Sequence, residues 1–213
     1  MPEISVVLVV AVAVASLALA VVPGPAVLYI LTASVSQGPR AGLVSVSGIH
    51  AGTLVHVLAA AVGLSSLIAA SATAFAVVKW AGVAYLIYLG VRALLSRESL
   101  TMPEQVLAVP YRRLFRDGLI VNVFNPKTAL FFLAFLPQFV DPGRGASVTQ
   151  LVLFGLVFLL MTGLSDSVIA VAGGALAGPL RRRPAGLPGQ RYVISGIYFA
   201  LGGYAALADG RRS

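Results

Sequence analysis

The segment LIVNVFNPKTALFFLAFLPQF, Leu119 to Phe139, holds a single charged residue, Lys127, within a run of leucine, valine, phenylalanine and alanine. A helix needs about 20 apolar residues to cross the roughly 30 Å core of a bilayer, and this segment is long enough. Pro126 stands directly before the lysine and interrupts the helix that such a segment would form. The segment therefore predicts a broken membrane helix with a cation at the break.

The composition of the whole chain also indicates a membrane protein. The 213 residues are 59% hydrophobic and 10% charged, with a mean hydropathy of +0.96, whereas soluble domains carry about 25% charged residues. The absence of cysteine excludes disulfides, thiolate metal sites and a cysteine nucleophile. The net charge of +8 comes from basic residues at the ends of apolar runs. We therefore expect no nucleic-acid partner, no cofactor and no metal.

Six apolar stretches predict an all-α integral membrane protein with about six transmembrane helices. They cover about residues 4–33, 41–70, 74–95, 114–139, 148–176 and 191–208. The first is expected to be a retained span, since a signal peptide has a basic start and a shorter apolar run. Five spans with one re-entrant segment are an open alternative, because the two longest runs allow it.

Basic residues between the stretches predict the orientation. With both termini outside, the inner loops hold Arg40, Arg92, Arg97, Arg112, Arg113, Arg116, Arg181, Arg182, Arg183 and Arg191. The outer side holds Lys79, Arg144, Arg211 and Arg212. The larger group belongs on the cytoplasmic side. We therefore expect both termini outside.

The two halves of the chain resemble each other at the proline motifs. A shift of 102 residues aligns PGPAVLYIL, residues 23–31, with NPKTALFFL, residues 125–133. Three spans per half is an odd number, so the halves would be inverted repeats. Helices broken at corresponding positions are typical of a transporter's midplane site. We expect one transporter domain, 1–213, with repeat 1 at about 1–95, a cytoplasmic loop at about 96–113 and repeat 2 at about 114–208.

The prolines of both motifs leave backbone carbonyls without helix partners, because proline lacks an N–H and its ring crowds the carbonyl four residues earlier. Pro23, Pro25 and Pro126 free the carbonyls of Leu19, Val21 and Asn122. Gly24, between two prolines, makes the first break especially hard to keep helical. Such carbonyls are tolerated in a membrane where they are buried in protein or line a wet cavity. A structural kink is the alternative, but two matched breaks, one with a lysine, favour a binding site.

Lys127 is predicted to lie deep in the membrane. It is 11 residues from Arg116 and 14 from Asp141, roughly 16 and 21 Å along a helix and too far for its side chain to reach water. A charge at that depth costs about 2.5 to 3.5 kcal/mol and should have a partner in the interior. Asp166, the one acid within an apolar run, is the predicted partner. His56 falls at a similar depth.

Four segments carry a resemblance to a known family. They are PGP at 23–25, GPRAGLVSVSGIHAGTLVHVLAAAVGL at 38–64, KWAGVAYLIYLGVR at 79–92 and FRDGLIVNVFNPKTALFFLAFLPQF at 115–139. Over nearly the whole chain the sequence resembles the LysE/RhtB family of bacterial amino-acid exporters. The resemblance implies a multi-pass protein of the bacterial cytoplasmic (inner) membrane that exports amino acids, coupled to the proton-motive force. GIHAGTLVH and the acid of the fifth span resemble the homoserine/threonine branch more than the lysine/arginine branch.

A hypothesis for the mechanism assigns roles to these residues. The predicted substrate-binding residues are Pro23, Gly24, Pro25, Asn122, Asn125, Pro126 and Lys127. The carboxylate of the amino acid would bind Lys127 and helix N–H groups, and its ammonium would bind Asp166, freed carbonyls and the two amides. Protonation of Asp166 or His56 from outside would couple proton entry to export. The predicted partners are an amino acid, protons and membrane lipid, and a homo-oligomer is left open.

Two other classes of function stay open. An intramembrane enzyme would use Lys127, Asp166 and His56 for acid–base chemistry. The sequence has no G-x-S-x-G elbow, no H-E-x-x-H zinc pair and no adjacent aspartates to support it. A membrane scaffold or assembly subunit would not need a charged, broken layer. We therefore expect a transporter and not an enzyme.

Structural roles are the alternative for each site residue. His56 shares a helix face with Gly48 and Gly52 at intervals of four, and this small-residue pattern by itself indicates close helix packing. The remaining structural alternatives are packing for His50, charge neutralisation for Asp166, and capping of freed carbonyls for Asn122 and Asn125.

Overall fold

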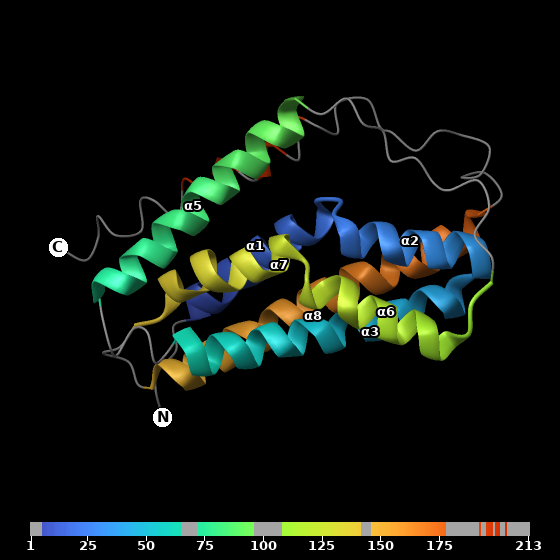
Figure 1. The fold of residues 1–213 in the computed structure, drawn as a ribbon, viewed down its shortest axis with the longest axis horizontal. Coiled ribbons are helices and arrows are strands. Elements are labelled where there is room, and N and C mark those ends of the chain that lie inside the picture. The colour runs from blue at the N-terminus through green and yellow to red at the C-terminus, as the bar shows by residue number, and fades with distance from the viewer. Residues whose placement is uncertain are drawn as a thin grey trace.

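The structure, a computed structural model, describes residues 6–64, 72–95, 108–141 and 146–177, with residues 192, 195–197, 199–200 and 203 near the C-terminus. Across these residues all regular structure is helical (Figure 1). This confirms the predicted all-α class. Most of the predicted sixth span, 191–208, and most of the predicted cytoplasmic loop, 96–113, lie outside the described residues.

The described helices follow one another along the chain. They are α1 (Val6–Val21), α2 (Pro25–Gln37), α3 (Pro39–Ala59), the π-helical η1 (Ala60–Leu64), α5 (Ala72–Leu95), α6 (Tyr111–Val123), α7 (Pro126–Leu130), the π-helical η2 (Phe131–Phe135), the 3-10 turn η3 (Leu136–Phe139) and α8 (Ser147–Ala175). Two continuous helices, Pro39–Gly63 and Ser147–Ala175, are long and apolar enough to cross a membrane. Two bent pairs raise this to as many as four spans within the described residues. A total of six stays a prediction.

Both proline motifs break a helix where the sequence predicts. The axes of α1 and α2 differ by 59° across the first motif, and those of α6 and the segment from Pro126 to Phe139 differ by 45°. Pro25 and Pro126 begin the second helix of each pair, where a missing N–H leaves no helix bond unmade. The predicted breaks in the first and fourth spans are therefore confirmed.

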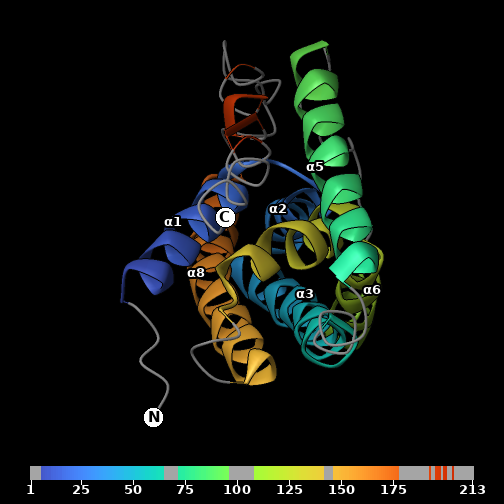
Figure 2. The same cartoon turned by 90° about the vertical axis from the view of Figure 1, so that its left-hand side faces the viewer.

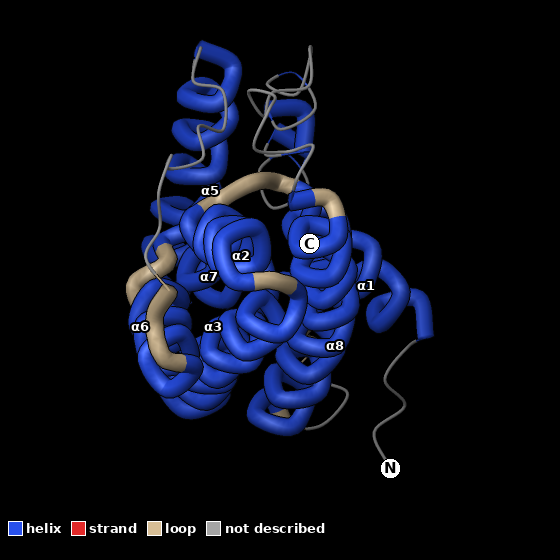
Figure 3. Tube along the Cα trace, turned by 90° about the vertical axis from the view of Figure 1, so that its right-hand side faces the viewer, coloured by secondary structure: helices blue, strands red, loops and turns tan. Residues whose placement is uncertain are grey.

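Small residues let α3 lie at the centre of the bundle. A Cβ added to Gly48 would strike the backbone carbonyl of Phe115, and one added to Gly52 would lie 2.9 Å from the carbonyl oxygen of Leu119. The backbone of α6 therefore lies directly on the glycine face of α3, as the small-residue pattern indicates. Figure 3 shows α3 below α2, with α6 and α8 on either side.

The helix α8 runs antiparallel to α3. A Cβ on Gly174, near the end of α8, would lie 2.5 Å from the nitrogen of Pro39 at the start of α3, and one on Gly155 would lie 2.8 Å from Val57. α8 also contacts both halves of the first broken helix, α1 and α2, while α3 contacts α6 of the second. Each long helix thus lies against the broken helix of the other half, while the division into two inverted repeats stays a prediction.

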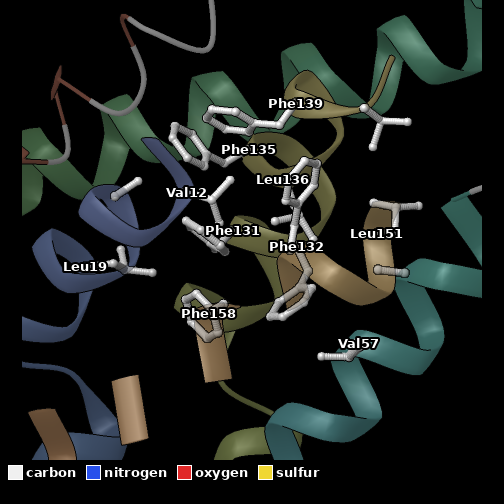
Figure 4. Close-up of a cluster of buried hydrophobic side chains, with 14 of the residues drawn as sticks. Val12, Leu19, Val57, Phe131, Phe132, Phe135, Leu136, Phe139, Leu151 and Phe158 are labelled. Carbon is white, nitrogen blue, oxygen red and sulfur yellow. The ribbon is translucent and has the colours of Figure 1, made fainter. Parts of the chain in front are cut away.

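An aromatic core forms where α1, α8 and the end of the fourth span meet (Figure 4). The ring of Phe131 lies 4.6 Å from that of Phe158 and 5.1 Å from that of Phe135, measured between centroids. Offset and tilted rings at such distances stabilise a core beyond their buried area. The core therefore anchors the segment that follows the second break.

The outside of the bundle is apolar, and polar side chains lie inside. Half-exposed or more exposed apolar residues include Val14, Leu58, Leu160, Leu164 and Val168, whereas Asn122, Asn125, Lys127 and Asp166 are buried. This distribution is expected where lipid surrounds the chain. α5 stands apart from the bundle and contacts it through α7 and η2 (Figure 2).

Candidate functional site

The first break, between α1 and α2, has no polar side chain of its own. Gly24 precedes α2 in an extended conformation, and no side chain caps the start of that helix. At the end of α1, Leu19 and Val22 are both 1% exposed. Buried carbonyls at such a position need a donor from elsewhere in the protein.

Lys127 supplies that donor from the second break. Its Nζ donates hydrogen bonds to the carbonyl oxygens of Leu19, at 3.1 Å, and Val22, at 2.8 Å. The residue is 8% exposed, and a Cβ added to Gly24 would lie 3.5 Å from its Nζ. A charged donor makes stronger bonds than a neutral one. The lysine of one half thus closes the break in the other half.

The second break is held by its own side chains. Asn125 caps α7, because its Oδ1 accepts a hydrogen bond from the backbone N–H of Lys127 at 3.1 Å. Its Nδ2 donates to Oδ1 of Asn122 at 3.3 Å, and the hydroxyl of Thr128 donates to the same oxygen at 3.1 Å. This break therefore keeps its shape without a donor from the first.

Asn122 and His56 tie the second break to α3. Asn122 Nδ2 donates to the carbonyl of Ile49 and to the hydroxyl of Thr53, both at 2.8 Å. His56 Nε2 lies 2.9 Å from the carbonyl oxygen of Asn122, so Nε2 carries the hydrogen, and the ring stacks on Phe132 at 6.0 Å. Side chains thus reach two of the carbonyls predicted to be freed, those of Leu19 and Asn122.

Asp166 lies on α8 with its carboxylate toward α3. Its Oδ2 is 3.2 Å from Nε2 of His50, and the two side chains are 8% and 13% exposed. The His50 ring lies over Gly163, where a Cβ would be 3.6 Å from Cε1. Nδ1 of His50 is buried and has no hydrogen-bond partner within the described part of the chain.

The predicted ion pair between Lys127 and Asp166 is not the pairing that the structure has. Lys127 donates to two backbone carbonyls, and Asp166 pairs with His50. The end of α1 carries partial negative charge from its unpaired carbonyls. It therefore provides the compensation that the sequence argument assigned to the acid.

These side chains surround a cavity of about 30 Å³. Its polar wall consists of His50, Thr53, Asn122, Asn125, Lys127, Thr128, Thr162 and Asp166, and its apolar wall of Leu19, Ala20, Ala26, Val27, Ile49 and Phe158. A volume of this size holds about one or two water molecules. A cation, an acid and neutral hydrogen-bonding groups thus share one small space.

The predicted site residues divide into two groups. Asn122, Asn125, Lys127 and Asp166 line the cavity. Pro23, Gly24, Pro25 and Pro126 shape the two breaks outside that wall, and His56 caps a carbonyl. The structure therefore brings together four of the five polar residues of the prediction, without His56, while the prolines act through the backbone.

Four polar residues of the cavity wall were not among the predicted site residues: His50, Thr53, Thr128 and Thr162. A signal for His50 exists in the helix ends. Pro39 meets Gly174, and from that contact His50 lies 11 residues along α3 and Asp166 lies 8 residues back along α8. These are depths of roughly 16 and 12 Å. When depth is counted from the helix ends that meet, and not from the arginines, His50 and Asp166 fall at similar depths on neighbouring helices.

The arrangement suits a zwitterion. Lys127 offers a cation for a carboxylate, while Asp166 and the carbonyls of Leu19 and Val22 offer acceptors for an ammonium group. The described residues contain no group of three or more histidines, aspartates or glutamates placed to hold a metal ion. The chemistry available within them is recognition of charge and transfer of protons.

Known proteins similar to this chain are membrane and efflux proteins. The model of the LysE type translocator family matches residues 17–208. An uncharacterized membrane protein of Pseudomonas aeruginosa is 32% identical over 185 residues, 84% of this chain and 86% of that protein. A homoserine/homoserine lactone efflux protein of Salmonella typhimurium is 30% identical over 159 residues, 75% of each chain. A leucine efflux protein of the same organism is 33% identical over 135 residues, 61% of this chain and 63% of that protein. No solved structure matches the chain.

Proposed function

Because this chain belongs to the LysE type translocator family, we propose that it exports amino acids across the bacterial cytoplasmic membrane in exchange for protons. Membership confirms the resemblance drawn from the proline motifs. With efflux proteins among its relatives, the chain is a transporter and not an enzyme. One observation carries the proposal: a buried cation and a buried acid line one cavity beside two broken helices.

The substrate would bind by exchanging partners with Lys127. The substrate carboxylate forms an ion pair with the ammonium group of Lys127. Lys127 then no longer donates to the carbonyls of Leu19 and Val22. The ammonium group of the substrate takes those carbonyls, with Asp166 as its counter-charge. Every buried charge keeps an opposite partner in this exchange, which is what a low-dielectric interior requires.

The side chain of the substrate is neutral in this proposal. Ala26, Val27, Ile49 and Phe158 form an apolar wall beside the threonine hydroxyls of the cavity. Such a wall suits an aliphatic or hydroxylated side chain and disfavours a charged one. The relatives named for homoserine and leucine efflux support the same class, which includes threonine-like substrates.

Proton antiport follows if a proton and the substrate compete for Asp166. A proton that enters from outside neutralises the charge of this carboxylate and lowers its affinity for an ammonium group. The amino acid then leaves, and deprotonation on the cytoplasmic side restores the site. His56, the other predicted proton carrier, has a backbone cap as its visible role, so we assign coupling to the acid.

The cavity must widen to hold an amino acid, and the breaks are the natural hinges. A volume of about 30 Å³ is smaller than any amino acid. Transporters with inverted repeats move one repeat against the other around a fixed site. We propose that repeat 1, about 1–95, and repeat 2, about 114–208, move in this way, as one transporter domain.

The orientation is tested with a single introduced cysteine. The excess of arginines predicts that a cysteine near Arg112 faces the cytoplasm. An impermeant maleimide should label it in inverted vesicles and not in intact cells. Labelling in intact cells would reverse the proposed orientation and with it the direction of export.

Transport itself is tested with purified protein in liposomes. Labelled leucine and homoserine are offered outside vesicles with an acidic lumen, so that the lumen stands for the outside of the cell. We expect uptake that depends on the pH gradient and is lost in Lys127→Met. Absence of transport by folded wild-type protein, across a panel of neutral and basic amino acids, would favour a scaffold subunit instead.

A further inference from the structure

His50 and Asp166 form a buried pair between the two central helices, α3 and α8. The carboxylate accepts from Nε2 of the ring at 3.2 Å, because an ionised carboxylate has no hydrogen to donate. A neutral imidazole with its hydrogen on Nε2 has a bare lone pair on Nδ1. That atom is buried and has no hydrogen-bond partner among the described residues. The pair therefore has one place where a proton can be added.

We propose that His50 carries the exchanged proton on Nδ1, and that Asp166 pairs in turn with the protonated ring and with the ammonium group of the amino acid. This inference rests on the proposed export function and moves the protonation step from the Asp166 carboxylate to the imidazole beside it. Imidazole is the side chain that gains and loses a proton near neutral pH without help from its surroundings. The open lone pair on Nδ1 gives His50 a place for the proton that leaves its contact with Asp166 intact.

The charges around His50 make proton and substrate exclude each other. His50 faces Asp166 of α8. Lys127 of α7 is the other charged residue in the cavity wall. The parts of α1, α2 and α6 in the wall contribute neutral side chains, and Tyr29 of α2 turns to the carbonyl of Leu114. With one acid and one lysine, the layer is neutral. Asp166 can pair with one further cation, either the imidazolium of His50 or the ammonium group of the amino acid. If both were present, one buried positive charge would have no partner.

The cycle balances one proton against one amino acid. With His50 neutral, Asp166 receives the ammonium group of a cytoplasmic substrate. When the site opens outward, a proton from external water adds to Nδ1, the imidazolium takes the carboxylate, and the amino acid leaves. When the site opens inward, Nδ1 gives its proton to cytoplasmic water. Each transfer exchanges one O–H bond of water for one N–H bond of the imidazole, or the reverse, and no other covalent bond changes.

The test compares two histidines on the same helix. His50→Gln keeps an amide that can donate to Asp166 but cannot carry a proton, and His56→Gln keeps a donor for the carbonyl of Asn122 and serves as the matched control. Each purified protein is reconstituted in liposomes with labelled leucine or homoserine, whichever the wild type carries. Two rates are measured: uptake driven by an acidic lumen, and exchange with the same unlabelled amino acid at equal pH, from pH 5.5 to 8.5.

The expected results separate coupling from translocation. Wild-type protein and His56→Gln should respond to the pH gradient, and their exchange should slow as the pH falls. His50→Gln should still exchange, its exchange should no longer depend on pH in this range, and the gradient should no longer stimulate uptake.

Each other result overturns one statement. A His50→Gln protein that still responds to the gradient would overturn the inference and leave export intact, with Asp166 as the carrier. A folded His50→Gln protein without any exchange would also overturn it, because the ring would then be needed for translocation itself. Wild-type protein that exchanges but ignores the gradient would remove proton coupling from the proposed function, and the role of His50 with it. Wild-type protein without exchange would remove the export function.

Discussion

The two helix breaks lie in corresponding places of the sequence but are stabilised in different ways. The second break holds Asn122, Asn125 and Thr128, whose side chains bond one another and the start of α7. The first break holds Pro23-Gly24-Pro25 and depends on the ammonium group of Lys127, which comes from the second. The second break is therefore held by its own side chains, and the first by a group that the substrate draws away in the proposed exchange.

This difference suggests where substrate enters the cycle. Moving Lys127 exposes two carbonyls at the first break and leaves the amide network of the second in place. A site that changes on one side and stays fixed on the other can bind a ligand without unfolding its surroundings. The predictions below test whether the two breaks are unequal in this sense.

The largest effect is expected from Lys127→Met, which removes the donor of the first break and the proposed carboxylate anchor together. The buried carbonyl of Val22 loses its donor, at a cost of about 1 to 3 kcal/mol, while that of Leu19 keeps the backbone N–H of Val22 at 3.2 Å. We expect loss of export and a lower thermal unfolding temperature in detergent, each measured separately from membrane abundance. Normal export by this variant would refute the proposed anchor.

Replacing the prolines of the first break should also abolish export, but without loss of folding. Pro23→Ala with Pro25→Ala restores helix-forming residues and supplies N–H groups for the carbonyls of Leu19 and Val21, the first of which Lys127 now holds. Membrane abundance should stay normal while uptake into liposomes falls to background. Pro126→Ala is the matched change at the second break, where capping side chains remain, and it should reduce uptake less. Equal losses of uptake from the two changes would show that the two breaks contribute equally to transport.

A moderate loss of stability is expected from Asn122→Leu. The amide makes four hydrogen bonds, two of them to α3, each worth about 0.5 to 1.5 kcal/mol. The unfolding temperature should fall more than in Ser47→Ala, which removes an exposed hydroxyl of α3. An unchanged unfolding temperature would show that the second break does not rely on its own amides.

The smallest effect is expected from His56→Leu. The carbonyl of Asn122 also accepts from the backbone N–H of Asn125 at 3.0 Å, so it keeps one partner when the imidazole is lost. We expect a stability loss of about 1 kcal/mol and export that still responds to a pH gradient. Loss of that response would return His56 to the role of proton carrier.

The sequence was sufficient for the helical class and for both breaks, because proline acts on the backbone locally. Pro23, Pro25 and Pro126 interrupt their helices whatever surrounds them. The glycine face of α3 could be read for the same reason, since Gly48 and Gly52 permit a close neighbour by lacking a side chain. Rules of this kind need no knowledge of the tertiary structure.

The sequence was insufficient for the partners of the charged groups. Backbone carbonyls are present at every residue and leave no mark in the sequence, so it could not show that the end of α1 would receive Lys127. Asp166 was predicted to be the partner of Lys127 because a sequence shows charged side chains but does not show which backbone carbonyls are free. His50 was missed because it lies ten residues after Arg40, which is in the first turn of α3, and was taken to be near the inner end of the helix without a partner.

The small volume between Lys127 and Asp166 also bears on how a bacterium keeps its energised membrane. A continuous watery passage would let ions flow down the membrane potential, and each elementary charge that crossed would dissipate about 2.3 kcal/mol per 100 mV. A cavity of about 30 Å³ has no room for a sodium or potassium ion with its hydration shell. In the proposed cycle only the proton exchanged for each amino acid would then cross the membrane, without a leak of sodium or potassium ions, which distinguishes a carrier from a pore.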